Sequence, residues 1–254
     1  MEMRSQLIKG IPCALLAVNV GLSMLWIIKK QATLVCEHVA IHIKAYPEQV
    51  FLTTQTILDL LQVTYRIPLT GQPIKAINSY LIRDKLAMQP LIKKAVVCKT
   101  WPSTLHIALE TKQLLARIII PECPNDKQLY LDENGSILSL NTAPLCRLLV
   151  VSADTLHTIA AAMQSADKGL WMLLHQLYQD RFLRSQITSL QIAPNHFITL
   201  GTQIGNHQIL FGKTENIHEK LEKLYVFYKE VIPYKGWHAY RQINVAFANQ
   251  LICQ

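Results

Sequence analysis

One uncharged segment near the start of the chain limits what the sequence can fold into. Residues 10–28, GIPCALLAVNVGLSMLWII, contain nineteen residues and no formal charge. As a helix at 1.5 Å per residue, this run is roughly 28 Å long, close to the hydrocarbon thickness of a bilayer. Trp26 lies near its end, where an amphipathic ring suits the headgroup interface. The segment predicts a single transmembrane helix after a short tail, residues 1–9.

Two other interpretations of residues 10–28 stay open. A cleaved signal peptide needs a short apolar core and then a small-x-small cleavage site, whereas this longer core is followed by Lys29-Lys30-Gln31. A buried helix of a soluble protein would rarely run so far without a charged face. The flanks are about equally basic, so the positive-inside rule does not decide the orientation.

The composition is that of a folded protein with a basic surface. Half of the 254 residues are apolar, 17% are charged, and the formal net charge is +8. Lys and Arg are scattered rather than gathered on one helix, which favours a solvated basic surface near a membrane over a nucleic-acid-binding protein. The six cysteines have no CxxC pair or regular spacing, so they predict neither a disulfide framework nor a zinc site.

Hydrophobic periodicity divides the remaining chain into two regions. The first contains, in order, a strand, two helices and two strands: residues 39–44, 51–61, 73–89, 94–99 and 104–110. The second helix is expected to begin at Pro73, because proline is favoured in a first helical turn. This order predicts two helices that cover one face of a small sheet.

The second region is richer in strands. Strands are expected at residues 116–120, 129–132, 137–140, 145–151, 187–192, 196–200, 208–211 and 242–248, with a short last run at 250–253. Helices are expected at residues 154–166, at 170–183 and after Thr214. Asn134-Gly135 predicts a tight hairpin, because both residues accept positive φ. The fold class is therefore α+β, with a mixed or antiparallel sheet in the second domain.

The sequence shows no catalytic constellation. It lacks GxSxG, Walker, HExxH and dinucleotide-binding motifs. His38 and His42 lie on one face of a strand but too far apart for one metal ion, and Asp132 and Glu133 beside Asn134-Gly135 are turn formers. The sequence predicts a binding protein with no enzymatic activity, cofactor or metal.

Several motifs resemble the FtsQ/DivIB family of bacterial cell division proteins. The order of the first region is similar to that of a POTRA domain, and residues 90–96 (PLIKKAV) and 101–107 (WPSTLHI) resemble the hairpin of the family's POTRA domain. Residues 130–135 (YLDENG) are similar to its "Y-x-D-x-x-G" hairpin. Residues 236–253 (GWHAYRQINVAFANQLIC) resemble the ending "G-W-x-x-Y-x-x-I-N-L-x-Y-x-N-Q-V-V-C" of the Bacteroidetes branch. Phe247 stands where that ending has tyrosine.

The resemblance implies a non-enzymatic, bitopic scaffold of the divisome. Its tail would lie in the cytoplasm and residues 10–28 would cross the inner membrane. A POTRA domain, residues 37–112, and an FtsQ-type β domain, residues 113–254, would lie in the periplasm, enriched at the division septum. The implied partners are the small coiled-coil membrane proteins FtsB (DivIC) and FtsL and, indirectly, the septal peptidoglycan synthase FtsW–FtsI, which the scaffold would help to recruit or regulate.

The end of the chain is the predicted binding site. A terminal strand over residues 242–248 is expected at the sheet edge, where unpaired N–H and C=O groups accept an added strand. The predicted partner-binding residues are Tyr240, Gln242, Ile243, Asn244, Val245, Phe247 and Asn249. The alternative is that the side chains of Ile243, Val245 and Phe247 merely fill the core.

Three rival functions remain. A POTRA-bearing protein of polypeptide translocation or outer-membrane assembly would usually carry several POTRA units and a barrel. A membrane-anchored hydrolase would need acid, base or nucleophile side chains gathered in one pocket. A soluble periplasmic protein would be released from a signal peptide.

Overall fold

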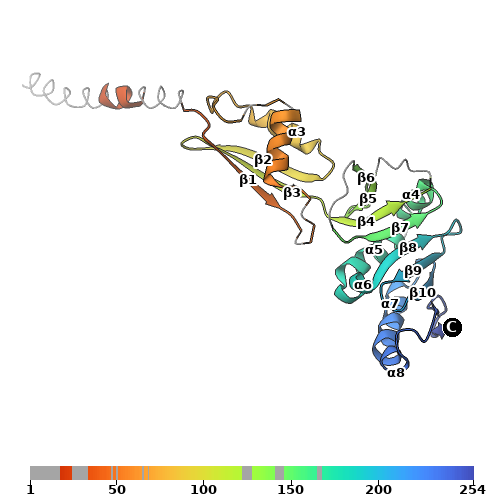
Figure 1. The fold of residues 1–254 in the computed structure, drawn as a ribbon. Coiled ribbons are helices and arrows are strands. Elements are labelled where there is room, and N and C mark those ends of the chain that lie inside the picture. Colours follow the sequence, from red (N-terminus) through yellow and green to blue (C-terminus); the bar gives the residue numbers. More distant parts are fainter. Residues whose placement is uncertain are drawn as a thin grey trace, which may run out of the picture. The chain divides into compact units, whose positions relative to one another are not determined.

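The computed structural model describes residues 18–24, 34–46, 48–49, 51–64, 66–67, 69–121, 128–140, 146–164 and 168–254. The chain forms two compact units: the first comprises residues 1–44 and 52–111, the second residues 45–51 and 112–254 (Figure 1). Residues 18–24 are helical, and the rest of the predicted transmembrane segment, residues 10–28, lies outside the described residues. Within the described ranges, no helix is both long enough and apolar enough to span a bilayer.

The first unit has the strand–helix–helix–strand–strand order that the sequence predicts. Its elements are β1 (His38–Lys44), α2 (Thr54–Asp59), the π-helical turn η1 (Leu60–Thr64), α3 (Ser79–Ala87), β2 (Ile92–Thr100) and β3 (Thr104–Thr111). β3 lies between β1, to which it is parallel, and β2, to which it is antiparallel. Alternate side chains of β3, such as Leu105 and Ile107, are buried in one core with Ile57 of α2 and Leu86 of α3. Both helices therefore pack on the same face of this sheet.

The helix expected from Pro73 begins instead at Ser79. The side-chain oxygen of Asn78 accepts hydrogen bonds from the N–H groups of Tyr80 and Leu81, both at 3.1 Å, and so caps α3. Pro73 forms a bridge with Val35. The prediction at Pro73 was wrong because this segment pairs with the chain that precedes β1, and the stronger cap lies five residues later.

The second unit is a mixed sheet with helices on one face. Its strands are β4 (Leu114–Ile119), β5 (Gln128–Asp132), β6 (Ile137–Leu140), β7 (Leu149–Ala153), β8 (Ile187–Ile192), β9 (Ile198–Thr202), β10 (Gln208–Gly212), β11 (Gln242–Asn244) and β12 (Ile252–Cys253). Among the described residues their order is β12-β11-β10-β9-β8-β7-β4-β5-β6. The pairs β4–β7, β7–β8 and β10–β11 are parallel, so the predicted α+β class with a mixed sheet is confirmed.

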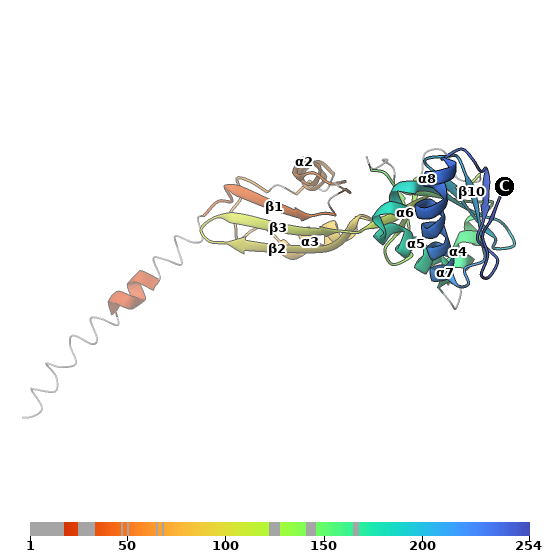
Figure 2. The same ribbon diagram turned by 90° about the horizontal axis from the view of Figure 1, so that it is seen from below.

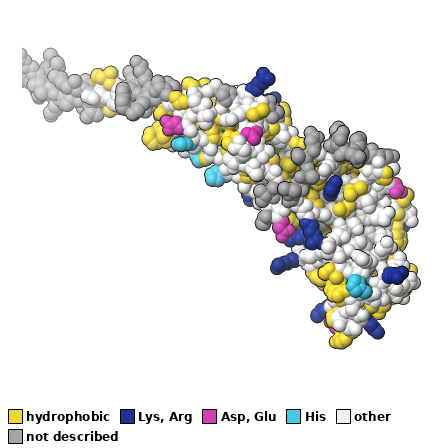
Figure 3. Space-filling model, viewed as in Figure 1, with side chains coloured by type: hydrophobic (Ala, Val, Ile, Leu, Met, Phe, Trp, Pro, Cys, Tyr) yellow, Lys and Arg dark blue, Asp and Glu magenta, His cyan; other side chains and the backbone are white. Residues whose placement is uncertain are grey.

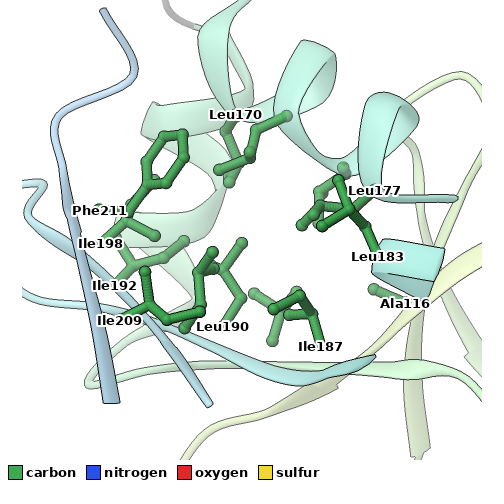
Figure 4. Packing of buried hydrophobic residues seen from close by; sticks show 14 of the residues in the cluster. Ala116, Leu170, Leu177, Leu183, Ile187, Leu190, Ile192, Ile198, Ile209 and Phe211 are labelled. Carbon is green, nitrogen blue, oxygen red and sulfur yellow. The ribbon is translucent and has the colours of Figure 1, made fainter. Parts of the chain in front are cut away.

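The helices of this unit bury the apolar face of the sheet. They are α4 (Leu156–Gln164), α5 (Gly169–Gln179), α6 (Arg181–Gln186), α7 (Ile217–Val226), the π-helical η2 (Phe227–Val231) and α8 (Ile232–Lys235). Figure 2 shows α5, α6 and α7 gathered on one side of the sheet. In Figure 4, Leu177 and Leu183 of these helices face Ile187 and Leu190 of β8. Each such buried side chain contributes roughly 1.5–3 kcal/mol.

The helix predicted over residues 170–183 is divided at Asp180. The side chain of Asp180 accepts the N–H of Leu183 at 2.7 Å and so caps α6, while its extended backbone ends α5. Asp180 also accepts a hydrogen bond from the hydroxyl of Tyr225 on α7. Burial and then the neighbouring Asp180 carboxylate raise the pKa of Tyr225 to about 12. A capping residue thus links three helices.

The predicted hairpin forms between β5 and β6 and turns through four residues, 133–136. Only Gly135 has a positive φ, +80°. Asp132 is buried, and its Oδ1 accepts the N–H groups of Asn134 at 2.9 Å and Ser136 at 2.8 Å. The nearby Lys112 ammonium lies 3.4 Å from Oδ2. Asp132 is therefore a turn former, as predicted, although the tight Asn-Gly turn is not formed.

A buried glutamine completes the hydrogen bonding at the start of β4. The side chain of Gln49 is 2% exposed. Its Nε2 donates to the carbonyl of Leu114 at 2.6 Å, and its Oε1 accepts the N–H of Leu114 at 2.9 Å. One side-chain amide thereby satisfies both main-chain groups of a buried residue, as a neighbouring strand would.

We expect Gln49→Ala to lower the free energy of unfolding by about 2 kcal/mol or more, because an unsatisfied buried group costs roughly 1–3 kcal/mol. Urea unfolding of the full-length protein in mild detergent, followed by circular dichroism, measures this change. The control is Gln191→Ala, at an exposed position of β8 in the same unit, which should change stability by less than about 0.5 kcal/mol. Equal shifts in the two variants would contradict the role of Gln49.

The raised pKa of Tyr225 predicts a loss of stability in alkali. The folded state holds the phenol proton more tightly than the unfolded chain, in which tyrosine titrates near pH 10. Its contribution is therefore complete below about pH 10 and is lost as the pH rises from about 10 to about 12. Urea midpoints should fall more steeply with pH over this range in the wild type than in Tyr225→Phe; parallel slopes would show that this phenol is not responsible.

Candidate functional site at the C-terminal sheet edge

The predicted terminal strand is shorter than expected and does not lie at the edge. β11 extends only over Gln242–Asn244, not to residue 248. It pairs in parallel with β10, where Ile209 lies opposite Ile243, and in antiparallel with β12, where Ile243 lies opposite Cys253. The edge strand is therefore β12, formed by the last residues of the chain.

The predicted binding residues divide into buried and accessible groups. Ile243 and Val245 are completely buried in the core of the second unit, as the alternative interpretation expects. Phe247 is 48% exposed and does not fill the core. The remaining predicted residues are half-buried or exposed: Tyr240, Gln242, Asn244 and Asn249. Contact with a partner by any of the seven stays a prediction.

A turn fixed to α7 reverses the chain between β11 and β12. Asn244 Oδ1 accepts the N–H of Ala246 at 3.0 Å and draws the backbone out of the strand. Lys223 Nζ then donates to the carbonyl of Phe247 at 2.7 Å, and Glu219 accepts the N–H of Asn249 at 3.4 Å. The Lys223 and Asn249 hydrogen bonds lower the pKa of the Glu219 carboxyl. These contacts explain why β11 ends at Asn244.

A buried histidine supports the start of β11. Since a carbonyl only accepts, Nδ1 of His207 donates to the carbonyl of Tyr240, at 2.9 Å. The His207 ring meets the Phe227 ring edge-on at 6.0 Å, and Phe227 also contacts the Tyr240 ring. His207 was not predicted from the sequence, because it lies 33 residues from Tyr240 in a segment with no motif.

β12 leaves main-chain groups open to a partner. The N–H and C=O of Gln254 both bond to Gln242, so Cys253, one position away, directs its own N–H and C=O away from β11. Ile252 is 38% exposed. Beside this edge lies an open polar hollow of about 800 Å³, lined in part by Gln208, Arg241 and Gln254. The arrangement suits the addition of a peptide strand.

Comparison with protein families agrees with this architecture. Residues 116–254, more than half of the chain, match the family described as FtsQ/DivIB, C-terminal related. The chain belongs to this family. Residues 34–110 match the POTRA-like domain. No curated protein matched the chain.

The two family matches indicate a divisome-like protein of the cell envelope. FtsQ/DivIB-related domains are typically non-catalytic, and divisome proteins are the partners that this relationship suggests.

The described residues of this FtsQ/DivIB-related chain contain no group of three His, Cys, Asp or Glu side chains that could hold a metal ion. His42 stacks on His106 of β3 at 6.4 Å, on the sheet face opposite the helices of the POTRA-like unit.

The FtsQ/DivIB-related unit has a second concave region, of about 540 Å³, near the starts of β7 and β8. Two of the three arginine side chains that line it, Arg147 and Arg184, are bonded within the unit. Arg147 donates to the carbonyl of Ser185 at 2.7 Å and to Gln203 Oε1 at 3.2 Å. Arg184 forms an ion pair with Glu48 at 2.9 Å. These bonds hold the lining of the cavity in place.

We expect the two groups of site residues to respond differently to truncation. Ile243→Ala should lower the free energy of unfolding by about 2–5 kcal/mol, because it opens a cavity in the core. Phe247→Ala, at an exposed position, should cost about 0.5 kcal/mol or less. Urea unfolding of both variants tests this difference. A cost for Phe247→Ala as large as that for Ile243→Ala would place Phe247 in the core after all.

Proposed function

We propose that this protein is a non-enzymatic, bitopic scaffold of the divisome. Residues 1–9 form a cytoplasmic tail, residues 10–28 cross the inner membrane, and a POTRA domain (37–112) and an FtsQ-type β domain (113–254) lie in the periplasm. Support comes from the order of the POTRA-like and FtsQ/DivIB-related matches behind one uncharged segment. The motif at residues 236–253 supports a Bacteroidetes-like member of FtsQ/DivIB.

The proposed partners are FtsB (DivIC)- and FtsL-like coiled-coil membrane proteins, and through them the septal synthase FtsW–FtsI. The observation that carries this proposal is the open edge of β12. A strand of the FtsB-like partner pairs with the N–H and C=O of Cys253, and the exposed Phe247 and Ile252 supply apolar anchors beside it. Ile243 and Val245 contribute indirectly, because they hold β11 and therefore β12 in place.

The alternative function is that of a POTRA-containing factor for polypeptide translocation or outer-membrane assembly. The POTRA-like match at residues 34–110 is compatible with either function. The identity of the proteins that bind the chain distinguishes the two.

Removal of one outward hydrogen-bond donor tests the edge. Deletion of residues 242–254 would also remove the buried Ile243 and Val245, so it would not separate binding from folding. Cys253→Pro instead deletes the N–H that faces the partner, whereas Cys253→Ser keeps it and changes only the thiol. We expect affinity purification from solubilised membranes to recover FtsB- and FtsL-like proteins with the wild type and with Cys253→Ser.

With Cys253→Pro, recovery should fall about tenfold, as loss of a buried hydrogen bond predicts. Unchanged recovery with Cys253→Pro would keep the scaffold and exclude the β12 edge. Recovery of translocation or outer-membrane assembly proteins in place of division proteins would favour the alternative function.

A further inference from the structure

The turn between β2 and β3 exposes a large aromatic ring. Trp101 is 76% exposed, and the adjacent Pro102 is also exposed. Among the described residues, none of the ring contacts involves Trp101. A tryptophan side chain usually buries roughly 150–250 Å², so the fold of this unit gains little from the ring. Its position suggests a surface that is covered in the working protein.

Apolar and basic side chains lie at the same end of the unit as this ring. We name the tip of the first unit the surface formed by Val35, Pro73, Lys75, Lys99, Trp101 and Pro102. Val35 is bridged to Pro73, and Lys99 Nζ donates to the carbonyl of Lys75 at 3.4 Å, which joins the turn to the loop before α3. Figure 3 shows hydrophobic side chains on the surface at the end of this unit where the β2–β3 turn lies. Glu37 is the acidic neighbour, since its N–H donates to Ser103.

This combination suits the interface of a bilayer. Tryptophan favours the headgroup level, where its amphipathic ring is partly shielded from water while its N–H keeps polar partners. Lysine side chains extend along such a surface and keep their ammonium groups near lipid phosphates. Each lysine near an anionic membrane adds electrostatic attraction to the lipid headgroups.

Chain connectivity places the tip at the membrane end of the unit. β1 is parallel to β3, with His38 opposite Thr104, so the start of β1 lies beside the β2–β3 turn. Nine residues, 29–37, separate the proposed transmembrane helix from β1 and span at most roughly 30 Å. The other end of the sheet lies roughly 26 Å further away, the length of β2. The tip is therefore the end of the sheet that the anchor holds nearest to the lipid.

We propose that the tip of the first unit docks on the surface of the bilayer that holds the anchor, with the Trp101 ring inserted among the lipid headgroups. This inference rests on the proposed function in one respect, the membrane insertion of residues 10–28. The contact fixes the orientation of the POTRA-like unit on anionic membranes and is strengthened by Lys75 and Lys99.

The test uses the full-length protein labelled with 5-fluorotryptophan and placed in nanodiscs of equal parts phosphatidylcholine and phosphatidylglycerol. Single Trp→Phe variants assign the fluorine resonances of Trp26, Trp101, Trp171 and Trp237. A lipid with a nitroxide near its headgroup then broadens the resonances that lie at the interface. We expect loss of the Trp101 resonance, while those of Trp171 and Trp237 keep their width.

Met88→Trp is the matched control. Met88 is 67% exposed, similar to Trp101, but it follows α3 at the opposite end of β2 in the same unit. Its added resonance should keep its width. Lys75→Glu with Lys99→Glu, or discs of phosphatidylcholine alone, should restore the Trp101 resonance at least in part.

The Trp26 resonance distinguishes failure of the docking proposal from failure of the proposed transmembrane anchor. Broadening of Trp26 without broadening of Trp101 overturns the docking proposal and leaves the anchor intact. No broadening of Trp26 contradicts the anchor itself. Equal broadening of the Trp101 resonance and of the resonance added by Met88→Trp overturns the proposal as well, because it indicates non-specific contact with lipid.

Discussion

Burial of one face of the mixed sheet is the constraint on which the second unit depends. Parallel neighbours in a sheet need crossover connections. β7 reaches β8 through α4, α5 and α6, and β10 reaches β11 through α7, η2 and α8. Both crossovers return over the same face, so their helices share one core in the described chain. The end of the chain belongs to that core because Ile243 and Val245 are buried in it, together with Phe227 and Tyr228 of η2.

Much of this architecture could be predicted from local patterns. The strands at residues 187–192 and 137–140 coincide with the observed β8 and β6, because alternation directly reflects one buried face. The predicted helix boundaries are wrong where a polar side chain hydrogen-bonds to main-chain N–H groups and so begins a new helix. Asn78 displaces the helix start from Pro73, and Asp180 divides the helix predicted over residues 170–183. The spacing of apolar residues does not show which of several polar side chains will cap a helix, so it cannot give these helix boundaries.

The site was only partly predictable, for a different reason. The spacing of Ile243 and Val245 correctly indicates a strand with a buried face, but interior and edge strands share that pattern. β12 distinguishes them, and although it lies within the short run expected at residues 250–253, the pattern there does not reveal that it pairs with β11. Some hydrogen bonds that stabilise the second unit join residues far apart in the sequence, as do those from His207 to Tyr240 and from Gln49 to Leu114. No local pattern in the sequence predicts which polar side chain will hydrogen-bond to a main-chain group distant in the sequence.

The shortness of β12 determines how a partner could be recognised there. Long open edges invite non-specific pairing, and a two-residue edge limits it. The same shortness limits affinity, since each main-chain hydrogen bond adds only about 1 kcal/mol. Under the proposed function, a specific partner strand needs side-chain contacts beyond the main chain of β12. Phe247, in the turn between β11 and β12, and Ile252, in β12, are exposed apolar side chains that suit such contacts. The bonds from Lys223 to the carbonyl of Phe247 and from the N–H of Asn249 to Glu219 fix the backbone of the turn, which under the proposed function lowers the entropic cost of binding.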